Sequence, residues 1–176
     1  MEHLLALDQQ LFLLINHLPH TSLSNAIALA ISGVGTAGII WFFLAVLLFV
    51  KEEKKATWFF APILAAGGTS LLLIEQIIKP LIARPRPTFE MGAIILGNTL
   101  PDFSFPSGHA TIAWALAVVL AYKEPKWKTF FFILAFLISF SRMYIGKHYP
   151  LDVLFGALLG WGIGRITLLV MHVHGK

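Results

Sequence analysis

The sequence predicts an all-α fold, a polytopic transmembrane bundle of five or six spans with a short interfacial helix at its N-terminus. Of its 176 residues 57% are hydrophobic and only 12% are charged, about half the charged fraction of a soluble domain. No Asp, Glu, Lys or Arg occurs from Leu23 to Val50, a stretch longer than the roughly 20 residues a spanning helix needs. The chain has no cysteine, which excludes a disulfide scaffold and thiolate chemistry.

Five apolar segments are the predicted spans, and each should be helical because a backbone in lipid must satisfy its own hydrogen bonds. They cover approximately residues 23–50, 56–78, 107–122, 129–146 and 149–171. The first is long enough for one tilted helix, or for a short helix followed by a span. The segment 4–18 is shorter and carries the polar residues Asp8, Gln9, Gln10 and Asn16. This composition favours a helix in the interface, and a sixth, short span is the alternative.

The basic residues predict the orientation. In the five-span arrangement one face receives Lys51, Lys54, Lys55, Lys123, Lys126, Lys128 and Lys176. The positive-inside rule makes this face cytoplasmic. The opposite face receives five cations that run against the rule, Lys79, Arg84, Arg86, Arg142 and Lys147. We therefore expect a multi-pass protein of the cytoplasmic (inner) membrane whose outer, periplasmic face holds cations for a functional reason.

Three separated segments meet at this outer face by span counting. They read KPLIARPRP over 79–87, FPSGH over 105–109 and SRMYIGKHYPLD over 141–152. Together they offer several cations, two histidines and a carboxylate. Clustered cations at a low-dielectric boundary need a multiply charged anion, and phosphate matches the planar fork of arginine. The segments therefore predict a phosphate site.

The local pattern adds chemistry to this site. Ser107 and Gly108 should open a helix whose free N–H groups favour an anion. If the last helix starts near Lys147, His148 and Asp152 share one of its faces, so that the carboxylate fixes the imidazole tautomer and leaves the other nitrogen to attack or to bind a metal. A metal ion held with His109 is possible on ligand type, but the neighbouring cations would repel it, and we expect none.

These segments resemble the three-part signature of the type 2 phosphatidic acid phosphatase superfamily. That group includes bacterial membrane lipid phosphate phosphatases and, more distantly, soluble vanadium haloperoxidases. The matching residues are Lys79-x6-Arg86-Pro87, Pro106-Ser107-Gly108-His109 and Ser141-Arg142-x5-His148-x3-Asp152. Every signature position is filled with its spacing intact. The resemblance implies a single integral-membrane phosphatase domain over residues 1–176, with signature segments 79–87, 106–109 and 141–152.

The resemblance also implies the role of each residue. His148 would be the nucleophile that forms a phosphohistidine, and Asp152 would orient it. His109 would protonate the leaving oxygen and then activate water. The phosphoryl oxygens would be held by Lys79, Arg86, Ser107, Gly108 and Arg142. No cofactor is implied, because a cationic cradle can stabilise phosphoryl transfer without a metal.

Two further charged residues are candidate headgroup contacts. Glu75 lies one turn before Lys79 and either pairs with it or reaches the substrate. Arg84 is not a signature position, and it either touches the headgroup or faces the interface. The loop 88–105 overhangs the site, and its apolar side chains either line an acyl-chain entrance or rest among headgroups; they are Phe89, Met91, Leu100, Phe103 and Phe105.

Gly156, Gly160 and Gly164 lie on one face of the last predicted span. Small residues at this spacing allow close helix contact, within the bundle or at a dimer face. We expect the bundle contact, and hence a monomer.

The expected function is hydrolysis of a lipid phosphomonoester or pyrophosphate. The candidate substrates are phosphatidylglycerol phosphate, undecaprenyl pyrophosphate, phosphatidic acid and the 1-phosphate of lipid A. The expected partners are this lipid and the bilayer, and no nucleic acid. Two alternatives come from other classes. A phosphate or lipid carrier without hydrolysis would need the cations but has no use for the His148–Asp152 pair. A vanadate-dependent oxidase would need bound vanadate.

Overall fold

The computed structural model describes residues 2–51, 59–98 and 101–172, and over these ranges the chain forms helices and no strand. The elements are α1 (Glu2–Asn16), α2 (Ser22–Val34), the short helix η1 (Thr36–Gly38), α3 (Ile39–Lys51), α4 (Ala61–Leu72), the π-helix η2 (Leu73–Ile78), α5 (Lys79–Ile82), the short helix η3 (Phe89–Met91), α6 (Gly108–Lys123), the short helix η4 (Pro125–Trp127), α7 (Lys128–Tyr144) and α8 (Pro150–Val170). The predicted all-α class is confirmed.

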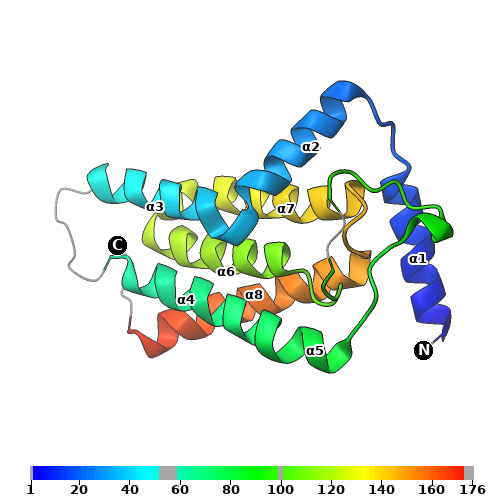
Figure 1. Cartoon of the computed structure of the whole chain (residues 1–176). Helices are drawn as coiled ribbons and strands as arrows, with labels where there is room; N and C mark the ends of the chain where they lie inside the picture. Colours follow the sequence, from blue (N-terminus) through cyan, green and yellow to red (C-terminus); the bar gives the residue numbers. More distant parts are fainter. Residues whose placement is uncertain (1, 52–58, 99–100, 173–176) are drawn as a thin grey trace.

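The long helices α3, α4, α6, α7 and α8 lie side by side, and α1 and α2 stand at one end of this bundle (Figure 1). Helix α6 is its centre, since it contacts α4, α7 and α8. Its residues are buried almost continuously from Ala110 to Ala121, whereas α8 exposes apolar side chains such as Leu158, 59% exposed, and Leu169, 70% exposed. An apolar outer surface around a buried helix is what a bilayer requires.

Two of the described helices are long and apolar enough to cross a membrane, the continuous helix 61–82 and α8. A third would be α2 with the segment Thr36–Lys51, which are bent by 54°. The bend falls where Ala37 and Gly38 have positive φ angles, so the first predicted segment is divided into two helices. Helices α6 and α7 have 16 and 17 residues, just below the usual spanning length. The chain is thus a helical membrane protein, and the count of five or six spans stays a prediction.

The glycine face of α8 packs against α6. A Cβ on Gly156 would lie 2.8 Å from the Ser107 carbonyl oxygen, and one on Gly164 would lie 2.7 Å from that of Ala115. At Gly160 a Cβ would overlap the Thr111 carbonyl oxygen. The small-residue face is therefore filled within the bundle, as the sequence predicted, and it draws the N-terminal ends of α6 and α8 together.

Helix α1 has one face directed into the protein. Asp8, Phe12 and Asn16 are spaced four residues apart and are buried, while Gln9 and Gln10 are exposed. Its outer face carries exposed leucines, among them Leu4, Leu7, Leu11 and Leu14. The helix packs on α7 and α8. Its position in the membrane interface stays a prediction, but two of the polar residues that suggested it face inward.

Candidate active site

His148 is held in one tautomer by the backbone. The imidazole is 1% exposed, and its Nδ1 atom lies 2.8 Å from the Ser104 carbonyl oxygen. Because a carbonyl oxygen only accepts, Nδ1 carries the hydrogen and donates it. The other nitrogen, Nε2, therefore has a free lone pair, and it lies 3.1 Å from Nη1 of Arg86. An imidazole in this state is a nucleophile.

His148 lies in the turn between α7 and α8 and not within the helix, because α8 begins only at Pro150, a residue suited to the first helical position. The expected helix start near Lys147 is therefore wrong, although the two side chains still lie close together, with His148 Nδ1 3.6 Å from Asp152 Oδ2. The turn depends on Gly146, whose φ of 77° is positive and where a Cβ would overlap the Ile94 carbonyl oxygen. A residue with a side chain would displace the turn that carries His148.

Asp152 lies beside the imidazole but does not form a direct hydrogen bond with it. Its Oδ2 atom lies 3.6 Å from His148 Nδ1, which is longer than a hydrogen bond. Oδ2 instead accepts hydrogen bonds from the Ser104 hydroxyl and, at 2.8 Å, from the Tyr149 N–H. Ser104 thus contacts both residues, its carbonyl bonding His148 and its hydroxyl bonding Asp152. The sequence analysis missed Ser104, whose only signal was its position next to the Phe105–His109 segment.

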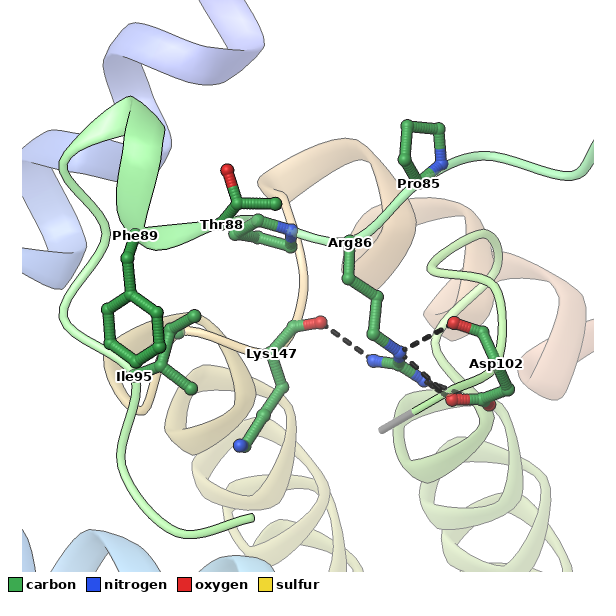
Figure 2. A pocket seen from close by; sticks show the side chains of 9 residues that line it. Pro85, Arg86, Thr88, Phe89, Ile95, Asp102 and Lys147 are labelled. Atoms are coloured by element: carbon green, nitrogen blue, oxygen red, sulfur yellow. Dashed lines mark hydrogen bonds and ion pairs between the residues drawn. The ribbon is translucent and has the colours of Figure 1, made fainter. Parts of the chain in front are cut away.

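Arg86 joins His148 to an acidic side chain. Its Nη1 donates to the Lys147 carbonyl oxygen at 2.7 Å, and its Nη2 lies 2.8 Å from Oδ1 of Asp102. Figure 2 shows the guanidinium between these partners, at the edge of a cavity of about 280 Å³ that Thr88, Phe89 and Ile95 also line. The sequence analysis did not single out Asp102.

Lys79 shares Asp102 with Arg86. Its ammonium, on a residue that is 5% exposed, lies 2.7 Å from Oε1 of Glu75 and also pairs with Asp102. The ion pair with Glu75 is the one that the four-residue spacing favours. Burial raises the pKa of Asp102, but the Lys79 hydrogen bond and the Arg86 charge outweigh it, so this pKa lies below its ordinary value. Asp102 is therefore a carboxylate at neutral pH.

Arg142 and Lys147 have no carboxylate partner within the described ranges. Arg142 is 5% exposed; it donates to the Ser32 hydroxyl, and its Nε has no hydrogen-bond partner among the described residues. Lys147 donates to the Asn98 carbonyl oxygen at 2.6 Å, and burial with the charges of Arg142 and Arg86 lowers its pKa. Buried charges are normally paired, so these two cations indicate an anion site.

The N-terminus of α6 borders this site. Ser107 caps the helix through its side chain, which accepts from the Ala110 N–H, and its own N–H bonds the Asp152 carbonyl oxygen at 3.0 Å. His109 lies in the first turn, with Nε2 3.3 Å from the Thr36 hydroxyl. It is near enough to Arg142 for the arginine charge to act on its ring.

Arg84 binds two carboxylates. Its Nη1 lies 2.6 Å from Oδ1 of Asp152, and its Nη2 lies 2.6 Å from Oδ2 of Asp8 on α1. The sequence analysis offered Arg84 as a candidate headgroup contact and treated Asp8 as an interfacial residue. Arg84 and Arg86 reach different partners from the segment after α5, where Ala83 has a left-handed conformation and each arginine precedes a proline, which disfavours helix.

Burial and charge keep the His148 imidazole neutral. Burial, with the charges of Arg142 and Arg86, lowers the pKa of His148 to about 4, although Asp152 acts to raise it. Of the residues predicted from sequence, the structure joins Lys79, Arg86, His148 and Asp152 in one hydrogen-bonded network through Asp102 and Ser104. His109, Ser107, Gly108 and Arg142 border this network, and within the described residues no three His, Asp or Glu side chains form a metal-binding group.

The fold and the site together identify the class of protein. It is a helical membrane protein with an anion site at one end of its bundle, where a buried, neutral histidine faces clustered cations. The chain belongs to the PAP2 superfamily, whose family model matches residues 60–176. The match includes both histidines of the site and its five cations, Lys79, Arg84, Arg86, Arg142 and Lys147. It leaves out α1, which supplies Asp8, α2, which supplies Ser32, and α3.

Comparisons with single proteins agree with the family. The chain is 38% identical over 101 residues to the undecaprenyl-diphosphatase of Sulfolobus acidocaldarius, covering 56% of this chain and 49% of that protein. It is 32% identical over 108 residues to the lipid A 4′-phosphatase of Bacteroides thetaiotaomicron, covering 57% and 48%. The chain thus spans about half the length of the curated relatives it matches.

Solved structures match over most of their length. The crystal structure of Aquifex aeolicus LpxE superposes with a TM-score of 0.77 at 33% identity, covering 91% of this chain and 93% of that one. A transmembrane PAP2 type phosphatidylglycerolphosphate phosphatase from Bacillus subtilis superposes with a TM-score of 0.79 at 23% identity, covering 98% and 88%. The second match is evidence for the fold alone.

Proposed function

We propose that this protein is an integral-membrane phosphatase that removes a phosphate group from a lipid phosphomonoester or pyrophosphate through a phosphohistidine. The observation that carries the proposal is the state of His148. Its Nδ1–H is fixed by the Ser104 carbonyl oxygen, and its Nε2 lone pair faces Arg86 among buried cations. Such an imidazole needs no general base before it attacks phosphorus.

In the first step, Nε2 of His148 attacks phosphorus, the N–P bond forms and the P–O bond to the lipid breaks. The Nε2 lone pair exchanges its hydrogen bond from Arg86 for this bond, and Arg86 then holds a phosphoryl oxygen. Lys79 and Arg142 hold the others, with the Ser107 hydroxyl and the Gly108 N–H. Phosphoryl transfer depends chiefly on positioning and on charge stabilisation, which buried cations supply at the point where charge develops.

His109 serves both steps as general acid and base. It protonates the leaving lipid oxygen in the first step and takes a proton from water in the second. The water oxygen then bonds phosphorus, the N–P bond breaks and phosphate leaves. The Thr36 hydroxyl, 3.3 Å from His109 Nε2, orients this ring. Asp152 supports His148 from the side of Nδ1, through Ser104.

Cations without a carboxylate partner in the described structure explain how the site accepts a dianion. Arg142 has a free Nε–H donor within the described structure, and Lys147 has only a carbonyl partner there. Asp102 already pairs with Lys79 and Arg86, so a phosphoryl group competes with this carboxylate for both.

The substrate is a lipid that reaches the site from the bilayer. An apolar groove of about 550 Å³, lined by Leu5, Ile82, Phe105 and Phe155, lies next to Arg84 and offers a path for an acyl or polyprenyl chain. The relatives are named for undecaprenyl diphosphate, lipid A and phosphatidylglycerophosphate. These lipids, with phosphatidic acid, are the candidates. The lysine-rich loops favour an orientation in which the site lies on the outer side of the cytoplasmic membrane.

Phosphate release in detergent tests this function. The purified protein is given each candidate lipid in excess EDTA, and released phosphate is measured. We expect release from at least one lipid, its loss in His148→Asn, and its retention in His172→Asn, a matched variant at an exposed histidine beyond α8. No release from any lipid, equal release by His148→Asn, or a requirement for added zinc or magnesium would contradict the proposal.

A further inference from the structure

Arg84 lies between two carboxylates that come from opposite ends of the chain. Its side chain is 15% exposed, while those of Asp8 and Asp152 are 1% and 0% exposed. Each carboxylate is 2.6 Å from a different terminal nitrogen, and the guanidinium carbon lies 4.1 Å from the centre of the Tyr149 ring. A planar fork can bridge two acceptors in this way, and a lysine ammonium cannot do so with the same geometry.

Every oxygen of the two carboxylates has a partner. Asp8 uses its second oxygen, Oδ1, to accept the Leu151 N–H at 2.8 Å, in the first turn of α8. Asp152 uses Oδ2 for the Ser104 hydroxyl and the Tyr149 N–H. The N-terminus of a helix favours negative charge, and Arg84 supplies the positive charge that two buried carboxylates need.

The bridge fixes the contacts of the catalytic imidazole. With Oδ1 bound to Arg84, Asp152 turns Oδ2 toward Ser104 and stays 3.6 Å from His148 Nδ1. Ser104 is then placed so that its carbonyl oxygen accepts the Nδ1 hydrogen. Without the guanidinium, the negative charge of Asp152 would act more strongly on His148 and would favour the imidazolium, whose Nε2 cannot attack.

Helix α1 completes the arrangement through three buried residues on one face. Asp8 binds Arg84, and Phe12 packs edge-on against Tyr149 with ring centres 5.3 Å apart. Asn16 accepts the Ile94 N–H at 2.7 Å and donates to the Tyr144 carbonyl oxygen at 2.9 Å. These contacts extend from Arg84, in the segment before η3, to Tyr149 at the start of α8. They hold α1 against the backbone around His148.

We propose that Arg84 is a positioning residue for Asp152, and that Asp8 makes the N-terminal helix part of the catalytic site. This inference rests on the proposed function for its meaning in turnover. It gives Arg84 a role other than contact with a headgroup. The groups that face His148 are Asp152 from α8, Arg86 from the segment after α5, Arg142 from α7 and His109 from α6, and Arg84 acts on it only through Asp152.

The first test measures the pH at which the His148 imidazole takes up a proton, by nitrogen NMR of the purified protein with His148→Asn for assignment. In Arg84→Gln the midpoint should move to higher pH, because Asp152 loses its counter-charge. The matched variant Arg165→Gln, which changes an exposed arginine on α8, should leave it unchanged. An unchanged midpoint in a folded Arg84→Gln protein overturns the proposal, and the measurement needs no substrate.

The second test uses Asp8 to separate charge pairing from packing. Asp8→Asn alone should lower the unfolding temperature, because it weakens the bridge. In the Arg84→Gln background it should raise that temperature, because it removes a buried carboxylate that has lost its counter-charge, while the His148 midpoint stays high. Equal losses in both backgrounds would show that Arg84 and Asp8 act independently and would overturn the coupling. Should Arg84→Gln fail to fold, the Arg84→Gln, Asp8→Asn double variant takes its place in the first test, where the His148 midpoint should still lie above that of the unmodified protein.

The third test is kinetic and applies once phosphatase activity is shown for the unmodified protein. Arg84→Gln should lower kcat by roughly tenfold or more, which is the usual effect of removing an outer residue that orients a functional side chain. The loss should be larger at acidic than at alkaline pH. KM and inhibition by inorganic phosphate should change less than about twofold, because Lys79, Arg86 and Arg142 remain. A raised KM with unchanged kcat would instead identify Arg84 as a headgroup contact. Lack of activity in the unmodified protein refutes the proposed function and leaves the first two tests standing.

Discussion

Nε2 of His148 lies 3.1 Å from Nη1 of Arg86 while its Nδ1–H is bound by the Ser104 carbonyl oxygen. This arrangement fixes which nitrogen is able to react and places it against a cation that can donate a hydrogen bond to a phosphoryl oxygen. It also joins three segments, since Arg86 follows α5, Ser104 precedes α6 and His148 precedes α8.

The geometry of Arg86 predicts that charge alone does not replace it. Its fork holds Asp102, the Lys147 carbonyl oxygen and Nε2 of His148 at once. Arg86→Lys should therefore lower kcat/KM by roughly 10²-fold, the cost of losing one fixed donor to a transition-state oxygen. The control is Arg165→Lys on the exposed face of α8, which should keep full activity. If Arg86→Lys is as active as this control, the bidentate geometry has no part in catalysis.

The lowered pKa of His148 predicts a loss of stability in acid. Its pKa of about 4 in the folded protein lies below the roughly 6.5 expected in the unfolded chain, so the unfolded state binds the proton more readily. The free energy of unfolding should therefore fall as the pH drops from about 6.5 to about 4. Unfolding temperatures in detergent measure this, and His148→Asn should show a shallower pH dependence over that window. Identical slopes for the two proteins would mean that His148 is not held neutral by the fold.

Removing the negative charge of Asp102 should increase the affinity of the site for phosphate. Its carboxylate pairs with Lys79 and Arg86 and so competes with any anion for them. Asp102→Asn should strengthen competitive inhibition by inorganic phosphate about two- to fivefold, the size of a partly exposed ion pair. Glu90→Gln, which changes an exposed acidic residue of the same loop, should have no effect. Weaker inhibition in Asp102→Asn would show that the carboxylate holds the cations in place and does not compete for them.

The two ends of the bundle should lie on opposite sides of the membrane. The segment between α5 and α6 lies at the end of the bundle near α1, and the connection between α6 and α7 lies at the other end (Figure 1). Glu90 belongs to η3 in the first of these segments, and Lys126 belongs to η4 in the second. Both are exposed, and the chain has no cysteine. In intact cells an impermeant thiol reagent should label Glu90→Cys, and it should label Lys126→Cys only after the membrane is opened. The reverse pattern would place the site on the cytoplasmic side.

The sequence predicted the fold class and the cationic segments because both depend on local patterns. Apolar length indicates a membrane helix, and Lys79, Arg86, Arg142, His148 and Asp152 stand at fixed spacings. Boundaries were less exact. The predicted span 56–78 begins among residues outside the described ranges, and its helix continues to Ile82.

The residues that the sequence did not reveal act through tertiary contact. Ser104 serves His148 with its carbonyl oxygen, which any residue type could supply, so its identity carries no signal. Asp8 is far from Arg84 along the chain, and only the packing of α1 brings them together. Thr36 reaches His109 from the break between α2 and α3, and no spacing rule links those segments. Asp102 lies in the loop 88–105, where only the apolar side chains were interpreted as functional from the sequence.

Trapping the covalent intermediate tests the central claim most directly. The His109→Ala variant is given a short pulse of radiolabelled nitrophenyl phosphate, a substrate whose good leaving group needs little protonation. Its second step still needs water activated by His109, so the labelled protein should accumulate. We predict label that is labile in acid and stable in alkali, that maps to His148, and that is missing in the His109→Ala, His148→Ala double variant. Label on Ser107 in the His109→Ala variant, label on His109 in the unmodified protein, or no label in any variant would contradict nucleophilic attack by His148.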